Sequence, residues 1–191
     1  VWLVEDATRG RQVALKALAG QAGMDEAAFL GFKQEFRTMA KLRHPNTCEV
    51  FDYGRLPDGT PYYTMEVVPG QGLDERPVSQ AELPSILRQL GLALGYIHQQ
   101  GFVHCDVKPE NIRIKPDGTV KLMDFGLIEL AGQQPAAIKG TIAFLAPEMA
   151  KLDRLDQRAD LYSIGVVTYQ LLTGKPPFEG ANPVEVLRAH I

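Results

Sequence analysis

The segment from His104 to Gly126 constrains the fold more than any other part of this chain of 191 residues. Four of its polar residues stand out, namely the carboxylates of Asp106 and Asp124, the amide of Asn111 and the ammonium group of Lys108. Between Asn111 and Asp124 lie two short β-rich runs joined by Pro116-Asp117-Gly118, a composition typical of a tight turn. One hairpin can therefore bring the four side chains together. Carboxylate and amide oxygens are ligands that Mg²⁺ shares with phosphate groups, so the segment predicts a site for a metal-bound phosphate.

The chain before residue 69 predicts a small β-rich unit with one helix. The expected strands are residues 1–5, 12–18, 49–53 and 62–68. Between Asp25 and Arg43, aromatic and aliphatic residues recur at spacings of three and four, which indicates an amphipathic helix. The sequence His44-Pro45-Asn46 is expected to end that helix, because proline restricts the residue before it.

The remainder of the chain predicts mainly helices. Residues 69–72, Pro-Gly-Gln-Gly, break the strand pattern and mark a linker. A helix is expected at residues 82–100, ended by Gly101, and a buried helix at residues 159–172, where the sequence is apolar nearly all round. This order of elements indicates an α+β fold of two lobes, residues 1–68 and residues 73–191, joined by residues 69–72.

Composition excludes several classes of function. The net charge of −3 gives no reason to expect nucleic-acid binding, and no apolar run approaches the roughly 18 residues of a membrane span. The cysteines Cys48 and Cys105 are too few for a disulfide framework, so a reducing cytoplasm is expected. The chain starts without methionine and without a signal peptide, and we expect it to be a fragment of a longer protein with further attached domains.

The order of motifs resembles that of protein kinases, and the sequence between the motifs is similar to that of bacterial serine/threonine kinases of the eukaryotic-like type. The resemblance rests on Val13-Ala14-Leu15-Lys16, Glu35, His104 to Asn111, Asp124-Phe125-Gly126, Ala146-Pro147-Glu148 and Asp160. It implies a two-lobed kinase fold that binds ATP and Mg²⁺ in the cleft and transfers the γ-phosphoryl group to a serine or threonine of a protein. Val1 matches the valine after the glycine-rich loop. The resemblance thus implies a kinase domain truncated at both ends, without that loop and without the last helices.

The resemblance also implies a role for individual residues. Asp106 matches the catalytic base, Lys108 the lysine that reaches the transferred phosphate, and Asn111 and Asp124 the magnesium ligands. The residues matched to ATP binding are Lys16 with its partner Glu35, Ala14, Val1, and the hinge residues Met65, Glu66 and Val68. Asp160 matches a buried aspartate that holds the backbone of the catalytic loop. His104, Phe125 and Met39 match an apolar stack between the lobes; for Met39, ordinary core packing explains the residue equally well.

Departures from the kinase pattern leave alternatives open. Cys105 stands where many kinases have an arginine that pairs with a phosphorylated activation loop, and Thr141 is the only hydroxyl residue between Gly126 and Ala146. These two features predict activity that does not depend on activation-loop phosphorylation. Arg113 occupies the usual place of a leucine beneath adenine; either its stem forms the floor while the guanidinium reaches solvent, or nucleotide affinity is weakened. A regulatory pseudokinase and a small-molecule phosphotransferase of kinase-like fold are the competing hypotheses.

Overall fold

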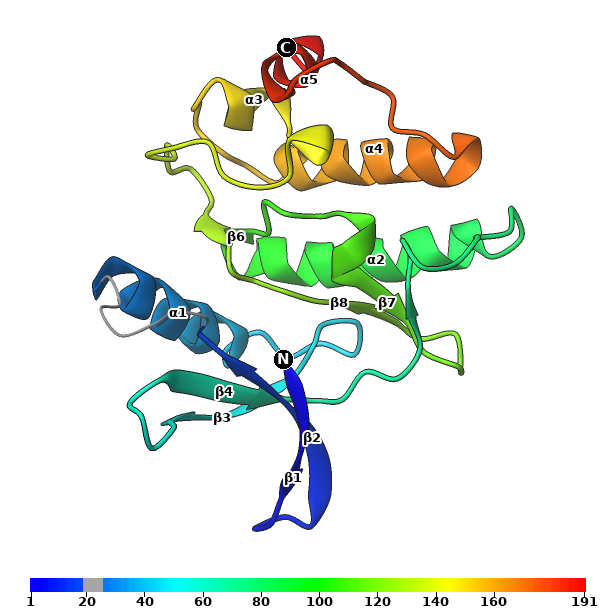
Figure 1. The fold of residues 1–191 in the computed structure, drawn as a ribbon. Coiled ribbons are helices and arrows are strands. Elements are labelled where there is room, and N and C mark those ends of the chain that lie inside the picture. Colours follow the sequence, from blue (N-terminus) through cyan, green and yellow to red (C-terminus); the bar gives the residue numbers. More distant parts are fainter. Residues whose placement is uncertain (19–25) are drawn as a thin grey trace.

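The computed structural model describes residues 1–18 and 26–191, and in it the chain forms two lobes (Figure 1). A four-stranded antiparallel sheet and one helix make up the N-terminal lobe, and helices with two small sheets make up the C-terminal lobe. The predicted α+β architecture is therefore confirmed. Within the described ranges, no helix has the length and apolar character that crossing a membrane requires.

The N-terminal sheet has the strand order β1-β2-β4-β3, and each pair is antiparallel. Its strands are β1 (Trp2–Asp6), β2 (Arg11–Ala17), β3 (Val50–Arg55) and β4 (Pro61–Met65). The register pairs Lys16 with Tyr63 and Ala14 with Met65. Because side chains alternate between the two faces of a sheet, these residues share one face. That face is the one that carries the chemistry described below.

Helix α1 (Glu26–Met39) packs on the sheet through aromatic residues. The rings of Phe32 and Tyr63 lie 5.1 Å apart, and those of Phe36 and Tyr53 lie 5.4 Å apart. The helix ends at Met39, four residues before the predicted end at Arg43. After an i→i−4 bond from Ala40, the next two N–H groups bond three residues back, so the last turn tightens and leaves the α-helical path. The predicted start at Asp25 lies outside the described residues.

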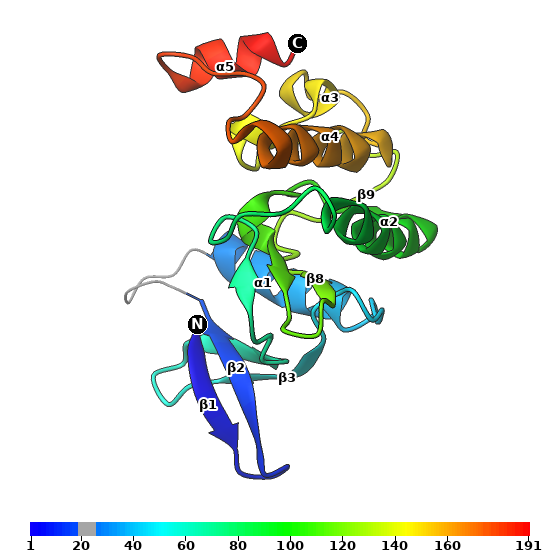
Figure 2. The same ribbon diagram turned by 90° about the vertical axis from the view of Figure 1, so that its right-hand side faces the viewer.

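Helix α2 (Leu83–Gln99) and helix α4 (Arg158–Thr173) form the body of the C-terminal lobe (Figure 2). The other elements of this lobe are β5 (Gln71–Gly72), β6 (Phe102–Val103), β7 (Ile112–Ile114), β8 (Val120–Leu122), β9 (Glu129–Leu130), α3 (Pro147–Ala150), α5 (Pro183–Ala189) and two short 3₁₀ helices at Pro109–Asn111 and Ile142–Phe144. Helix α4 was expected to be buried nearly all round, and this expectation is wrong. Leu161, Tyr169 and Leu172 are about half exposed, because neighbouring elements cover only one side of α4.

A lysine of the C-terminal lobe bonds to the chain on the N-terminal side of the linker. Lys121, in β8, donates to the backbone oxygen of Thr47 and forms an ion pair of 2.6 Å with Glu66. The Glu66 backbone N–H bonds in turn to the oxygen of Glu49. Beyond this point, Gln71 and Gly72 of the predicted linker pair with β7, so the second half of the linker belongs to the small sheet β5-β7-β8.

Candidate active site

Three charged residues from distant parts of the chain meet on the inner face of the N-terminal sheet. The ammonium group of Lys16 lies 2.8 Å from Glu35 Oε1 and 3.1 Å from Asp124 Oδ1. Burial by itself would lower the pKa of Lys16, but the two carboxylates outweigh it and raise that pKa above its ordinary value. Burial likewise opposes ionisation of Asp124, yet Lys16 brings its pKa below the usual range. Both groups are therefore charged at neutral pH.

A tyrosine is bonded to this triad of Lys16, Glu35 and Asp124, and no sequence motif indicated it. The hydroxyl of Tyr63 donates to Glu35 Oε1 over 2.7 Å, the same oxygen that contacts Lys16. Burial and the neighbouring Glu35 raise the pKa of Tyr63, so the phenol keeps its proton. Glu35 itself is only 8% exposed. The available signal was the two-residue alternation along β4, which places Tyr63 on the same face as Met65.

The catalytic-loop residues form a second polar cluster around Asp106. Its Oδ2 lies 2.9 Å from the Lys108 ammonium and accepts from the Asn111 amide at 2.9 Å. Its Oδ1 accepts from the backbone N–H and the hydroxyl of Thr141, each at 3.3 Å. Lys108 also donates to the Thr141 hydroxyl at 2.8 Å, so this threonine contacts both charged groups of the loop. The cluster thus places the carboxylate of Asp106 next to the ammonium group of Lys108.

Asp160 holds the backbone of this loop from behind, as expected. Its fully buried carboxylate accepts from the N–H groups of His104 and Cys105, both at 2.9 Å. The imidazole of His98, in α2, lies 2.7 Å from the same carboxylate, a contact that the sequence analysis missed. Cys105 has a φ of 67°, in the left-handed region that few non-glycine residues adopt. The two backbone bonds to Asp160 fix this unusual bend, which directs Asp106 toward the cleft.

Two members of the predicted apolar stack between the lobes, His104 and Phe125, contact each other through their rings. His104 and Phe125 lie edge to face with their centroids 5.0 Å apart, and both are almost fully buried. Burial lowers the pKa of His104, so the imidazole is neutral; its Nδ1 accepts from the Asp106 N–H at 3.3 Å. Met39 is also buried in the same core cluster as Phe125. His104 therefore supports Asp106 directly, in addition to filling the core.

A cavity of about 300 Å³ is lined by Lys16 and Asp124 of the triad and by Asn111 of the catalytic-loop cluster. Its wall is formed by Val1, Lys16, Met39, Tyr63, Met65, Glu110, Asn111, Arg113, Met123 and Asp124. Five of the predicted site residues thus line one space. Ala14, Glu66 and Val68 do not line it, although Ala14 is paired with Met65 and the other two continue the chain after Met65. Glu110 and Met123 are wall residues that the sequence analysis did not assign to the site.

Arg113 is partly buried on the wall of the cavity, and both expectations for it stay predictions. Its Nη2 donates to the backbone oxygen of Gly70, just beyond the hinge. Its Nε is buried and has no hydrogen-bond partner within the described ranges. The guanidinium therefore belongs to the wall of the cavity.

The oxygen atoms available in the cavity fit a magnesium ion. The Asn111 amide nitrogen donates to the backbone and side-chain oxygens of Asp106, and among the described residues no donor is bonded to the amide oxygen, which is therefore available to a cation. Asp124 contributes a carboxylate that is ionised at neutral pH. A hard cation such as Mg²⁺ is commonly bound by one or two such oxygen ligands together with phosphate oxygens and water.

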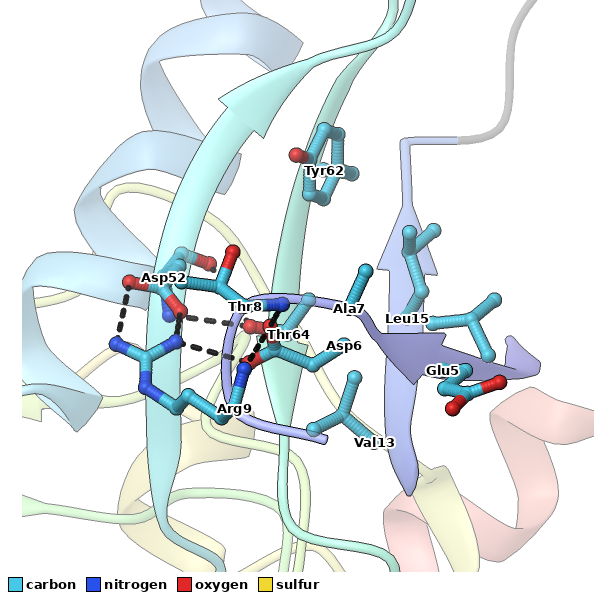
Figure 3. A pocket seen from close by; sticks show the side chains of 11 residues that line it. Glu5, Asp6, Ala7, Thr8, Arg9, Val13, Leu15, Asp52, Tyr62 and Thr64 are labelled. Carbon is cyan, nitrogen blue, oxygen red and sulfur yellow. Dashed lines mark hydrogen bonds and ion pairs between the residues drawn. The ribbon is translucent and has the colours of Figure 1, made fainter. Parts of the chain in front are cut away.

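A larger hollow of about 450 Å³ lies elsewhere, beside strands β1 to β4 (Figure 3). Arg9 joins Asp6 to Asp52 there, with an N–O distance of 2.9 Å to Asp6. None of the predicted site residues lines this hollow. The chemistry therefore lies in the smaller cavity.

Comparison with known proteins agrees with this geometry. The protein kinase domain family matches residues 1–191, which is the whole chain. The chain belongs to the protein kinase family. Among curated kinases, it is 38% identical over 205 residues to serine/threonine-protein kinase PknB of Mycobacterium tuberculosis and 37% identical over 204 residues to PknB of Mycobacterium leprae. It is also 38% identical over 205 residues to a probable serine/threonine-protein kinase of Streptomyces coelicolor.

These alignments cover the whole of this chain but only 33% of each PknB and 30% of the Streptomyces protein. The chain thus spans about a third of the length of the curated relatives it matches. Protein kinases as a family use ATP and Mg²⁺, and the residues around the cavity are of the types that this chemistry requires.

Proposed function

We propose that this chain is the catalytic unit of a serine/threonine protein kinase. It would bind ATP and Mg²⁺ in the cavity and transfer the γ-phosphoryl group to a serine or threonine hydroxyl of a protein substrate. The observation that carries the proposal is that two charged groups, the Lys16–Glu35–Asp124 triad and the Asp106–Lys108–Asn111 cluster, both contribute to the wall of one cavity. The residues of these groups that line it are Lys16, Asp124 and Asn111. Phosphoryl transfer depends mainly on positioning and charge stabilisation, which such an arrangement supplies.

Each cluster has a distinct task in this proposal. Lys16, charged and fixed by Glu35 and Tyr63, would hold the phosphates of the nucleotide. Asn111 and Asp124 would hold the magnesium ion, which neutralises phosphate charge when bound. Asp106 would orient the substrate hydroxyl and accept its proton, while Lys108 would stabilise the negative charge on the transferred group.

Replacement of Asp106 by asparagine tests the assignment. The amide keeps the shape but cannot accept the proton, so phosphate transfer from radiolabelled ATP to a generic protein should fall by about 10²- to 10⁴-fold. Binding of ATP should remain, because Asp106 does not line the cavity wall. Asp153→Asn, the same change at an exposed site, is the matched control. Undiminished transfer by Asp106→Asn would refute the role of Asp106.

The same assay separates the competing hypotheses. A regulatory pseudokinase would bind nucleotide without transferring phosphate in any variant. A small-molecule phosphotransferase would label low-molecular-weight acceptors and not protein. The intact set of Lys16, Asp106 and Asp124 favours the active protein kinase.

We further propose that activity does not require phosphorylation of the activation segment. The place of the usual arginine is taken by Cys105, which lies beside the apolar residues Leu127, Met149 and Leu155. The segment is instead held by backbone bonds between Leu155 and residues 132 and 133, and by an ion pair of 3.3 Å between Lys139 and Glu129. Mass spectrometry that found a stoichiometric activating phosphate between Leu127 and Leu145 would contradict this.

The setting of the enzyme belongs to the same proposal. Both cysteines are free and buried, which supports a reducing compartment such as the cytoplasm. The greater length of the relatives supports further domains attached to the catalytic unit in the full-length protein.

A further inference from the structure

Tyr63 connects the N-terminal sheet to helix α1 at the Lys16–Glu35 ion pair. Its backbone lies inside the sheet, paired with Lys16 of β2 on one side and with Tyr53 of β3 on the other. Its side chain is only 1% exposed, and its hydroxyl donates over 2.7 Å to Glu35, a residue of α1. The phenol therefore has a fixed base in the sheet and a hydrogen-bond partner in the helix.

The other contacts of Tyr63 with α1 are less directional. The rings of Phe32 and Phe36 lie 5.1 and 5.9 Å from the ring of Tyr63. Burial of apolar surface is a non-directional force, so it tolerates small rolling or sliding of the helix. A hydrogen bond requires a short distance and a favourable angle together. The bond from Tyr63 thus selects one orientation of Glu35 among those that the ring packing allows.

One oxygen of Glu35 serves two donors. Oε1 accepts from the Tyr63 hydroxyl and also lies 2.8 Å from the ammonium group of Lys16. Burial and the neighbouring Glu35 raise the pKa of Tyr63, so the phenol remains a donor at neutral pH. Two roles with opposite consequences follow. If Tyr63 only shares the charge of Glu35, its removal leaves Lys16 more firmly paired; if Tyr63 holds Glu35 in place, its removal releases Lys16.

We propose that Tyr63 is a positioning residue that holds helix α1 against the sheet, so that the Lys16–Glu35 pair stays closed without nucleotide or a partner protein. This inference rests on the proposed function, in which Lys16 holds the phosphates of the nucleotide, and it adds how that site is kept in its working arrangement. Tyr63 acts through Glu35 and Lys16 and does not itself transfer a proton or a phosphoryl group.

The test measures how fast a trace of acetic anhydride acetylates Lys16 in the full-length protein without nucleotide, with mass spectrometry of the peptides as the readout. A lysine reacts only when it is deprotonated and accessible, so the closed ion pair protects Lys16. Tyr63→Phe keeps the ring and removes the donor. It should raise the labelling rate of Lys16 about 3- to 10-fold, the shift in the opening equilibrium that loss of one hydrogen bond produces.

Lys121 is the internal reference for general loosening of the fold. It is also buried and ion-paired, but it lies in β8 of the C-terminal lobe. Its labelling rate should be the same in Tyr63→Phe as in the wild-type protein, with the exposed Lys151 used to normalise both rates.

Two neighbouring tyrosines provide matched control variants. Tyr62→Phe makes the same change one residue earlier in β4, where the side chain lines the hollow on the opposite face of the sheet (Figure 3). Tyr53→Phe removes a buried hydroxyl that has no hydrogen-bond partner among the described residues. Both variants should label Lys16 at the wild-type rate.

Phosphate transfer provides a second readout. Tyr63→Phe should reduce transfer by a smaller factor than it accelerates labelling, because only the open fraction of the molecules is inactive. A Glu35→Ala background lacks the acceptor of the bond. There, the additional change Tyr63→Phe should alter labelling and transfer by less than about twofold, since the two residues act through one contact.

Several results would overturn the inference. These are slower or unchanged labelling of Lys16 in Tyr63→Phe, an equal rise at Lys121, an equal rise in either control variant, and an undiminished effect of Tyr63→Phe in the Glu35→Ala background. If the wild-type protein transfers no phosphate, the proposed function fails while the labelling rates still test Tyr63. If transfer proceeds and the labelling of Lys16 does not respond, only the inference on Tyr63 fails.

Discussion

Replacement of Asp160 by asparagine should loosen the catalytic loop without touching the cavity itself. The carboxylate of Asp160 accepts three hydrogen bonds, from the N–H groups of His104 and Cys105 and from the His98 ring. An amide of the same shape has one oxygen and one NH₂ group, so it cannot accept all three. In either orientation of the amide, at least one of the three donors loses its acceptor and faces the NH₂ group of the asparagine instead.

The size of the effect follows from these contacts. A hydrogen bond to a charged acceptor contributes about 1.5–3 kcal/mol, and an orphaned buried N–H costs about 1–3 kcal/mol. An Asn oxygen at the place of Oδ2 can keep the bonds to His104 and His98 but faces the Cys105 N–H with an NH₂ group, and loss of the buried charge removes some desolvation cost. We therefore expect the free energy of unfolding to fall by about 2–4 kcal/mol. The bend at Cys105, with φ of 67°, should relax once its N–H is released.

Two measurements check this expectation. Urea denaturation gives the loss of stability, and steady-state kinetics gives the consequence for catalysis. Because Asp106 directly follows Cys105, its carboxylate should be misplaced, so kcat should fall while the KM for ATP stays nearly constant. Asp153→Asn changes the same charge at an exposed position and should leave both quantities unchanged.

The reasoning would be refuted by a loss of stability below about 1 kcal/mol, since the lost contacts alone exceed that value. It would also be refuted if stability fell but kcat matched that of Asp153→Asn. In that case the bonds to Asp160 would stabilise the lobe without positioning Asp106.

Two further changes probe the triad and the buried thiols. Tyr63→Phe removes one hydrogen bond to Glu35 but keeps the ring, so unfolding free energy measured in urea should fall by about 1–3 kcal/mol, and transfer should decrease only modestly; an unchanged stability would argue against the bond. Cys48 and Cys105 should resist iodoacetamide at pH 8 in the folded protein and react in urea, because both are buried and burial raises the pKa of Cys48 to about 12 and also raises that of Cys105. Since both pKa values are higher in the folded state, the free energy of unfolding is unaffected below about pH 8.5 and declines as the pH rises through the folded values. Rapid labelling of the folded protein would contradict this.

The charged residues of the site could be predicted from sequence because their types and separations are themselves the signal. Lys16 and Glu35 stand 19 residues apart and form the expected pair, and Asp160 holds the loop as expected. Tyr63 and His98 could not be found in the same way. A tyrosine in a strand and a histidine in a helix are ordinary residues, and their partners lie 28 and 62 positions away, so only the packed structure joins them.

The end of helix α1 differs from its predicted position for another physical reason. The apolar spacing continues through Leu42, but the backbone bonds shorten to i→i−3 after Ala40, and side-chain pattern does not report on that change. Arg113 shows a similar limit. Its alternation along β7 places it on the cavity side, but whether a long side chain extends or folds back onto Gly70 depends on the backbone oxygen that the hinge offers.

The ion pair between Lys121 and Glu66 has a consequence for how the two lobes move. Glu66 is tied to β8 by its carboxylate and to Glu49 by its backbone, so rotation at this residue would break a half-buried ion pair and a backbone bond together. Beyond it, Gly70 has a φ of 111°, which glycine adopts readily and other residues resist. We therefore expect any change of the angle between the lobes to pivot between Val67 and Gly70. The oxygen that holds Arg113 sits on that pivot, so a change of lobe angle also moves the wall of the nucleotide cavity.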